Sequence, residues 1–238
     1  MITVVIPTLQ AEAGLPATLS ALVPAAVEGL VREVIVVDGG STDATLRIAD
    51  GCGATVLTCK PGRGQQMRLG ADAARQPWLL FLHADTVLAP GWEREAGTFI
   101  DSTERAGAPR AAAFSFALDD IGTWPRVVEW GVAWRSAILR LPYGDQGLLI
   151  PAKLYRDLGG HPPSPLMEDV AFVRKLGRRR LVMLRSAAVT SADKYRRDGY
   201  MARIARNLTC LTLYNLGVPA HRIARVYAGG DRSIVRED

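Results

Sequence analysis

Four short apolar runs in the first half of the chain each end in polar or glycine residues, and this alternation constrains the fold more than any other feature. The runs occupy residues 2–6, 33–37, 54–57 and 78–82. They are too short for helices, and the first two are rich in β-branched residues, which predicts buried strands. We expect helices between them at 15–22, 44–52 and 65–74. Strands alternating with helices predict an α/β fold with a mainly parallel sheet covered by helices on both faces.

Polar residues follow these predicted strands at the points where the strands end. They are Pro7-Thr8, Asp38, the Gly62-Arg63-Gly64 loop and Asp85. Ligands of open α/β sheets bind beyond the carboxyl ends of the strands. We therefore expect these four segments to meet at one edge of the sheet and to form a ligand site there.

The second half is less regular. We predict strands at 111–118, 147–150 and 181–184, and helices at 127–139, 154–158, 168–176 and 200–216. The last of these helices has amphipathic spacing, whereas Trp130 and Trp134, one turn apart on helix 127–139, are expected in the core, with stacking on an acceptor as the alternative. The change of pattern near residue 105 divides one unit, residues 1–238, into two halves, 1–105 and 106–238.

The charge is unevenly spread. Residues 171–238 carry 15 Lys and Arg against 5 Asp and Glu, whereas the rest carry 14 and 19. A basic segment suits anionic lipid, a phosphorylated substrate or nucleic acid, or is a solvated helical face. Aromatic residues do not interleave with the basic ones, so we expect no nucleic-acid partner.

Cysteine usage and the N-terminus bear on location. Three cysteines without CxxC spacing argue against a disulfide framework or a zinc site. The first residues have no basic segment followed by a long apolar one, and no apolar run is long enough to span a membrane. We expect a cytoplasmic protein, with the inner face of the membrane as an alternative position.

Several motifs, in a fixed order, carry a resemblance. The chain resembles family-2 glycosyltransferases of the GT-A (nucleotide-diphospho-sugar transferase) fold, and more closely a small bacterial subgroup with Phe-Leu-His-Ala-Asp in place of Asp-x-Asp. The motifs that match are Val4-Val5-Ile6-Pro7-Thr8 with Glu12, Val36-Val37-Asp38-Gly39-Gly40-Ser41-Thr42-Asp43, Gly62-Arg63-Gly64-Gln65-Gln66, Phe81-Leu82-His83-Ala84-Asp85 and Glu168-Asp169. The resemblance implies an enzyme that transfers a sugar from a UDP- or GDP-sugar to a hydroxyl acceptor. Residues 1–105 would bind the donor and 106–238 the acceptor.

The resemblance also implies a donor site. Its residues would be Pro7, Thr8, Glu12, Asp38, Arg63, Gln65 and Ala84. An exposed carboxylate at Asp38 can accept hydrogen bonds from a ribose or a uracil imide, although a turn-forming Asp is the plain alternative. Arg63 can pair with a phosphate that the Gly-rich loop approaches, or the loop is an ordinary turn.

A divalent cation is expected beside the donor diphosphate, because Mg²⁺ or Mn²⁺ neutralises the leaving group through oxygen ligands. By resemblance Asp85 is its ligand. His83 replaces the family's other aspartate. An imidazole suits Mn²⁺ better than Mg²⁺, and the alternatives are a contact with the donor or a structural histidine.

Glu168 and Asp169 open a predicted helix, where carboxylates are also favoured by the helix dipole. By resemblance one of them, and we expect Asp169, deprotonates the acceptor hydroxyl. Transfer with inversion needs one such base and no covalent nucleophile. The segment Tyr143-Gly144-Asp145-Gln146-Gly147 would border the acceptor or the donor sugar, unless it is only a β-turn. A Gln-x-x-Arg-Trp motif is absent, which favours single addition over processive synthesis.

Two other functions fit the same fold. A sugar nucleotidyltransferase would carry a longer Gly-rich, lysine-bearing loop where this chain has Pro7-Thr8-Leu9-Gln10. A catalytically degenerate binding or membrane-surface protein would explain His83, with the basic C-terminal region as its working part. The same region also suits a lipid-linked acceptor. His161 and His221 match no motif and are expected to be structural.

Overall fold

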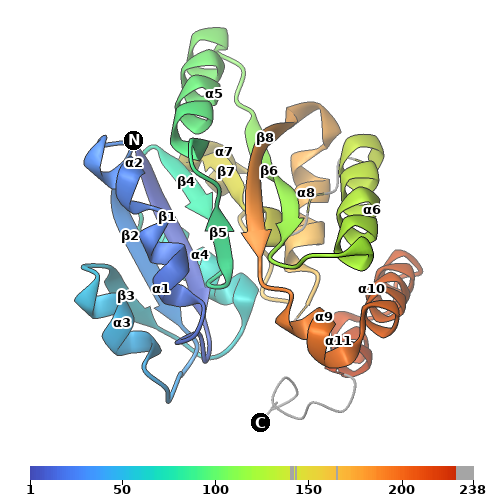
Figure 1. Ribbon diagram of the computed structural model, residues 1–238. Helices are drawn as coiled ribbons and strands as arrows, with labels where there is room; N and C mark the ends of the chain where they lie inside the picture. The colour runs from blue at the N-terminus through green and yellow to red at the C-terminus, as the bar shows by residue number, and fades with distance from the viewer. Residues whose placement is uncertain (140–141, 143, 165, 229–238) are drawn as a thin grey trace.

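The computed structural model describes residues 1–139, 142, 144–164 and 166–228, and one mixed sheet runs through both halves of the chain. Its order is β3-β2-β1-β4-β7-β6-β8-β5. The strands of the first half, β1 (Ile2–Thr8), β2 (Val31–Asp38), β3 (Thr55–Thr58) and β4 (Trp78–Phe81), are mutually parallel. The predicted α/β fold with a mainly parallel sheet is confirmed (Figure 1).

The strands of the second half bring in the antiparallel pairs. β7 (Leu148–Pro151) runs antiparallel to both β4 and β6 (Ala111–Leu118), and β8 (Leu181–Thr190) pairs parallel with β6. A three-residue strand, β5 (Thr86–Leu88), closes the edge antiparallel to β8. Because β7 is reversed, the loop before it lies at the same edge of the sheet as the loop after β4.

Side chains alternate along the central strands between two cores. On one face, Val4 and Ile6 pack with helices α1 (Leu15–Ser20), α2 (Val23–Val27), α3 (Thr45–Gly51) and α5 (Trp92–Ala106). On the opposite face, Val5 packs with α4 (Arg63–Ala73), α7 (Ala152–Asp157) and α8 (Glu168–Leu176). Helices thus cover both faces of the sheet (Figure 1), and the loops at the carboxyl ends of the parallel strands, rather than the strand interiors, are where polar residues can gather.

The remaining helices lie at the β6 and β8 side of the sheet (Figure 1). They are α6 (Thr123–Leu139), α9 (Asp193–Asp198), α10 (Tyr200–Asn215) and α11 (Ala220–Ala228), with short 3₁₀ turns at Gly144–Gln146 and Arg178–Arg180. α10 and α11 form a hairpin whose small core holds Cys210 and Ile223 and reaches Met167, next to Glu168. Within the part of the chain that the structure describes, no helix is long and apolar enough to span a bilayer.

Several sequence expectations need correction. Helix α5 was not predicted, although Trp92, Ala96, Phe99 and Ile100 have helical spacing and are buried. β5, α9 and α11 were also missed. The prediction that Trp130 and Trp134 lie in the core is wrong, because their exposed fractions are 71% and 54%. The core face of α6 is formed instead by Val128, with Val132 packed against it.

Candidate active site

Thr8 and Asp38 lie side by side where parallel strands β1 and β2 end. The Thr8 hydroxyl donates to Asp38 Oδ1 (2.9 Å), and the Ser41 hydroxyl donates to the same oxygen (2.6 Å). The amides of Gly40 and Ser41 donate to Oδ2 at 2.8 and 2.7 Å. The expectation of an exposed Asp38 carboxylate is wrong, since the side chain is fully buried and four protein donors occupy it.

The charge of Asp38 is stabilised by these bonds. Burial alone would raise its pKa, but the hydrogen bonds from Ser41, Thr8 and Gly40 outweigh burial and lower it. Asp38 therefore stays ionised and fixes the turn 38–41. A nucleoside could bond to this carboxylate only by replacing one of the present donors.

A second loop, residues 9–12, is bonded across this turn. Gln10 accepts from the Thr42 amide (2.8 Å) and donates to the Thr42 hydroxyl (3.0 Å), and Glu12 accepts from the Ala44 amide (3.0 Å). Gln10 has a φ of 52°, in the left-handed region. Gln10 thereby joins the loops that follow β1 and β2.

Gln66, rather than Gln65, is the buried glutamine of the Gly-rich loop. Its side-chain amide donates to the carbonyls of Thr8 (2.7 Å) and Val37 (2.8 Å), and ties α4 to both strand ends. Gln65 is exposed. The two adjacent glutamines cannot be distinguished from sequence, because their helical phase relative to β1 and β2 depends on where α4 begins.

Arg63, the first residue of α4, lies between an acid and an imidazole. Its Nε is 3.2 Å from Glu168 Oε1, and its Nη1 is 3.2 Å from His83 Nε2. A guanidinium can only donate, so Nε2 accepts and carries no proton. Burial, assisted by the Arg63 charge, lowers the pKa of His83 to about 4.

Glu168 is the buried partner of this pair, with a side chain only 1% exposed while that of Arg63 is 37% exposed. Burial raises the pKa of Glu168, and the Arg63 charge opposes that rise. Gly64 allows the close approach, since a Cβ there would lie 2.1 Å from the Pro162 carbonyl oxygen and 3.2 Å from Glu168 Cβ. The expected Gly-rich loop is thus packed against the start of α8.

Asp169 lies beside this pair, in the first turn of α8. Its Oδ2 accepts from the amide of Gly144 (2.8 Å). A Cβ on Gly144 would come within 2.6 Å of His83 Nε2, so Gly144 also contacts the imidazole. A cavity of about 20 Å³ borders His83, Gly144 and Asp169, enough for one water molecule. Met167, immediately before Glu168, has a φ of 63°, an uncommon value for a residue other than glycine.

The segment before β7 lies at the same edge, but its side chains differ in environment. Gln146 is buried, accepts from the Ser136 hydroxyl (3.1 Å) and donates to the Phe114 carbonyl (3.0 Å). Burial raises the pKa of Asp145 to about 6, with the Arg135 charge acting against it. Tyr143 lies outside the described residues.

Asp85 lies in the loop after β4, two residues beyond His83. The Ala84 carbonyl accepts from the Thr18 hydroxyl (2.9 Å), and the Ser191 amide donates to the Asp85 carbonyl (3.2 Å), so the backbone is held from two sides. The Asp85 carboxylate is 35% exposed and lies 3.7 Å from the ammonium of Lys194 on α9.

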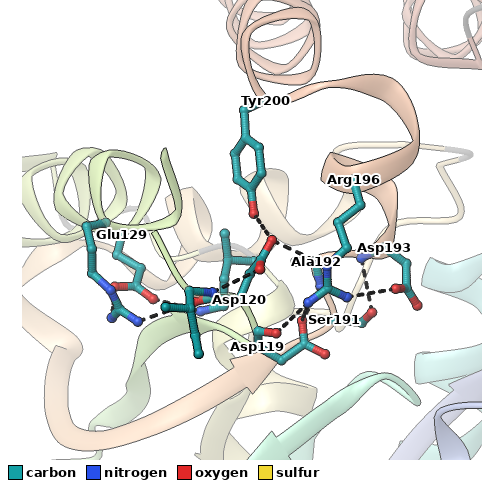
Figure 2. A network of polar contacts seen from close by, with 11 residues as sticks. Asp119, Asp120, Glu129, Ser191, Ala192, Asp193, Arg196 and Tyr200 are labelled. Atoms are coloured by element: carbon teal, nitrogen blue, oxygen red, sulfur yellow. Dashed lines mark hydrogen bonds and ion pairs between the residues drawn. The ribbon is translucent and has the colours of Figure 1, made fainter. Parts of the chain in front are cut away.

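A network of polar contacts fixes α9 and therefore Lys194 (Figure 2). Arg196 is within 3.4 Å of Asp119, 3.3 Å of Asp120 and 3.0 Å of Asp193. The Tyr200 hydroxyl donates to Asp120 (2.6 Å). The loop that leads into α6 is thereby joined to the segment that borders Asp85.

The donor set can be tested against a divalent cation. Among the described residues, no three His, Cys, Asp or Glu side chains are grouped so that they could hold a metal by themselves. Small hard cations are commonly held by one or two carboxylates together with substrate phosphates, so the exposed Asp85 carboxylate fits. His83 does not fit through Nε2, which faces a guanidinium at 3.2 Å.

The family model described as glycosyl transferase family 2 matches residues 3–125. The chain belongs to glycosyl transferase family 2. The matched segment contains β1 to β6, including Thr8, Asp38, Arg63 and Asp85.

Curated relatives match little more than a third of this chain. A PGL/p-HBAD biosynthesis glycosyltransferase of Mycobacterium bovis is 38% identical over 95 residues, which cover 37% of this chain and 36% of the relative. An uncharacterized glycosyltransferase of Mycobacterium tuberculosis is 38% identical over 91 residues, 38% of this chain and 39% of the relative. The match therefore spans little more than a third of these relatives.

Solved structures extend the likeness over almost the whole chain. Glucosyl-3-phosphoglycerate synthase of M. tuberculosis, in complex with Mn²⁺, UDP and glucosyl-3-phosphoglycerate, aligns with a TM-score of 0.64 and 19% identity, over 92% of this chain and 81% of that one. S. aureus TarS 1–349 aligns with a TM-score of 0.62 and 16% identity, over 98% and 73%. At these identities the alignments establish the GT-A fold of the family.

Proposed function

We propose that the protein transfers a sugar from a nucleoside-diphosphate sugar, UDP- or GDP-linked, to the hydroxyl of an acceptor with inversion at the sugar. The observation that carries the proposal is the meeting of Arg63, His83, Gly144 and Asp169 at the edge where Thr8, Asp38 and Asp85 also lie. Membership of the family supports it. So does the presence of UDP and Mn²⁺ in a structure of the same fold.

The donor would lie along the ends of β1, β2 and β4. The turn 38–41 and the loop 9–12 would border the nucleoside, with Pro7, Thr8 and Glu12 as their supports. Arg63 is 37% exposed, so its guanidinium can turn one edge toward a diphosphate while Nε keeps its contact with Glu168. A divalent cation bound by Asp85 and the diphosphate would neutralise the charge that develops on the leaving group.

Of the two acids, Asp169 suits the role of base. Glu168 is buried and ion-paired with Arg63, so it cannot reach an acceptor hydroxyl. Asp169 is only part-buried, and its bond to the Gly144 amide fixes the carboxylate without adding a proton to it. We propose that Asp169 takes the acceptor proton as the hydroxyl attacks, and that Glu168 positions Arg63.

Thermal unfolding with a panel of nucleoside diphosphates, each with and without Mn²⁺, tests the donor site. A ligand present at about 100 times its Kd stabilises the native state by roughly 2.7 kcal/mol. We expect a shift with one nucleotide that requires the cation in native protein and is lost in Asp85→Asn. Asp157→Asn, an exposed aspartate on α7, is the matched control. The proposal fails if no nucleotide shifts the native protein, or if Asp85→Asn keeps the full cation-dependent shift.

A further inference from the structure

Helix α6 exposes an apolar face on the side opposite its core contacts. Trp124, Val127, Trp130 and Trp134 have exposed fractions of 48%, 45%, 71% and 54%. At about 100° per residue they fall, with Gly131, within roughly 120° of the helix circumference. We call these five residues the tryptophan face. It contains no charged side chain.

This exposure is unusual for the molecule. The chain has five tryptophans, and the other two, Trp78 and Trp92, are buried. Ile121, just before α6, is 96% exposed. Contiguous exposed apolar surface marks an interaction site more often than scattered single residues do.

The neighbouring helices supply the charge. Val128 and Val132 of α6 belong to the same small apolar cluster as Tyr200 and Ile204 of α10. α10 itself exposes Met201 and Leu208. Residues 119–139 and 193–228 together contain nine Lys and Arg and five Asp and Glu. Residues 199–228 contain four arginines and no acid. The apolar face therefore belongs to a region of positive charge.

We propose that the tryptophan face docks the protein on the surface of an anionic lipid bilayer. Tryptophan is favoured at the membrane–water interface because an apolar ring meets a polar edge there. Arg203 and Arg206 of α10 pair with Asp198, whereas Arg222 and Arg225 of α11 are exposed, and anionic head groups complement these exposed arginines. A second copy of the chain fits less well, since a symmetric contact would bring the same positive regions together.

The docking surface is connected to the candidate active site. Ser136 of α6 donates to Gln146, two residues after Gly144, whose amide holds Asp169. The core of the α10–α11 hairpin includes Met167, which precedes Glu168. On the proposed function, on which this step rests, the acceptor is an amphiphilic alcohol presented by the same bilayer. The basic C-terminal region predicted from the sequence then supports the contact, while α6 supplies its apolar part.

Vesicle binding of the full chain tests the surface directly. The probes are phosphatidylcholine vesicles with and without phosphatidylglycerol, at low and high salt. We expect salt-sensitive binding to the anionic vesicles, with a blue shift of tryptophan emission and quenching by brominated acyl chains. The double variant W130Q/W134Q should bind at least about tenfold more weakly, because two large apolar side chains are no longer transferred out of water on binding.

Val23→Gln/Val27→Gln is the matched control, because α2 exposes these two valines at 56% and 82% on a different part of the surface (Figure 1). It should bind vesicles like native protein. Equal binding to vesicles with and without anionic lipid, unchanged binding of W130Q/W134Q, or a dimer that dissociates in W130Q/W134Q would each overturn the proposal. The cation-dependent nucleotide shift should persist in W130Q/W134Q. If native protein shows no cation-dependent nucleotide shift, the proposed function is wrong, whereas the result on vesicle binding is unaffected.

Discussion

Glu168 and Arg63 form an ion pair, 3.2 Å between Oε1 and Nε, in which the acid is buried and the base remains partly open to solvent. The pair joins the first residue of α8 to the first residue of α4. The pair therefore joins residues 1–105 to residues 106–238, as the contact of Asp85 with Lys194 also does, and Asp169 is the next residue along the chain after Glu168.

Glu168→Gln should destabilise the protein. Removing one member of a buried ion pair costs about 3–5 kcal/mol, and the partial exposure of Arg63 reduces this to roughly 1–3 kcal/mol. The measurement is the free energy of unfolding in urea. Asp157→Asn, which removes the exposed pair with Lys153, should change it by less than about 0.5 kcal/mol. Equal effects of the two substitutions would show that Glu168 contributes no more than a surface acid.

Asp169→Asn should abolish most transfer and preserve the fold. An amide oxygen can still accept from the Gly144 amide, but it cannot take a proton, and loss of a general base typically costs about 10²–10⁴-fold in rate. Transfer is measured with the nucleotide sugar whose nucleoside diphosphate shifts the unfolding temperature. The nucleotide shift itself should be unchanged. Transfer within a few-fold of native would assign the proton to another group.

Gly64→Ala should be destabilising and should disturb the donor loop. The added Cβ would lie 2.1 Å from a backbone oxygen of Pro162, so α4 and the loop before α8 must separate, at a cost of about 1–3 kcal/mol. Gly97→Ala is the control, because nothing lies within 4 Å of a Cβ there and the residue is inside α5. Alanine in a helix should stabilise it by roughly 0.5–1 kcal/mol. Opposite signs in urea unfolding are the expected result.

Acid should weaken the fold through His161. Its Nδ1 is 2.9 Å from the Tyr155 hydroxyl, and burial lowers its pKa to about 4. The unfolded chain binds the proton near pH 6.5, so the stabilisation is complete above that pH and is lost as the pH falls toward 4, by about 3 kcal/mol.

The control for this prediction is His161→Asn, which removes the titrating group and keeps a polar side chain. Unfolding free energies of both proteins are measured between pH 7 and pH 4. The native protein should lose more stability over this range than the variant. Parallel curves would mean that His161 is protonated as easily in the native state as in the unfolded chain.

Strand ends could be predicted from the sequence because they depend on local patterns. The runs at 2–6, 33–37 and 78–82 became β1, β2 and β4, with Thr8, Asp38 and Asp85 at or just beyond their ends. The short strand β5 could not be predicted in this way, since its only ladder is with β8, about a hundred residues later. Helix α5, by contrast, could have been predicted, because its buried apolar residues have helical spacing.

Side-chain environment was harder to predict than position. Asp38 was expected to be exposed, but its burial depends on Ser41 and Gly40 folding back over the carboxylate. Trp130 and Trp134 were expected in the core because α6 is apolar on most sides. Periodicity cannot tell which of two apolar faces meets the sheet, and here Val128 and Val132 occupy that position.

The reversed direction of β7 has an evolutionary consequence. Because this strand pairs antiparallel with both β4 and β6, the segment that precedes it emerges among the loops that follow the parallel strands. Three segments far apart in the sequence, residues 119–122, 144–147 and 191–199, follow β6, precede β7 and follow β8 at this same edge of the sheet. Residues can be inserted or exchanged in any of them without a change of strand order. On the proposed function, new acceptors can accordingly be acquired by altering these segments while the strand ends of residues 1–105 keep their sequence.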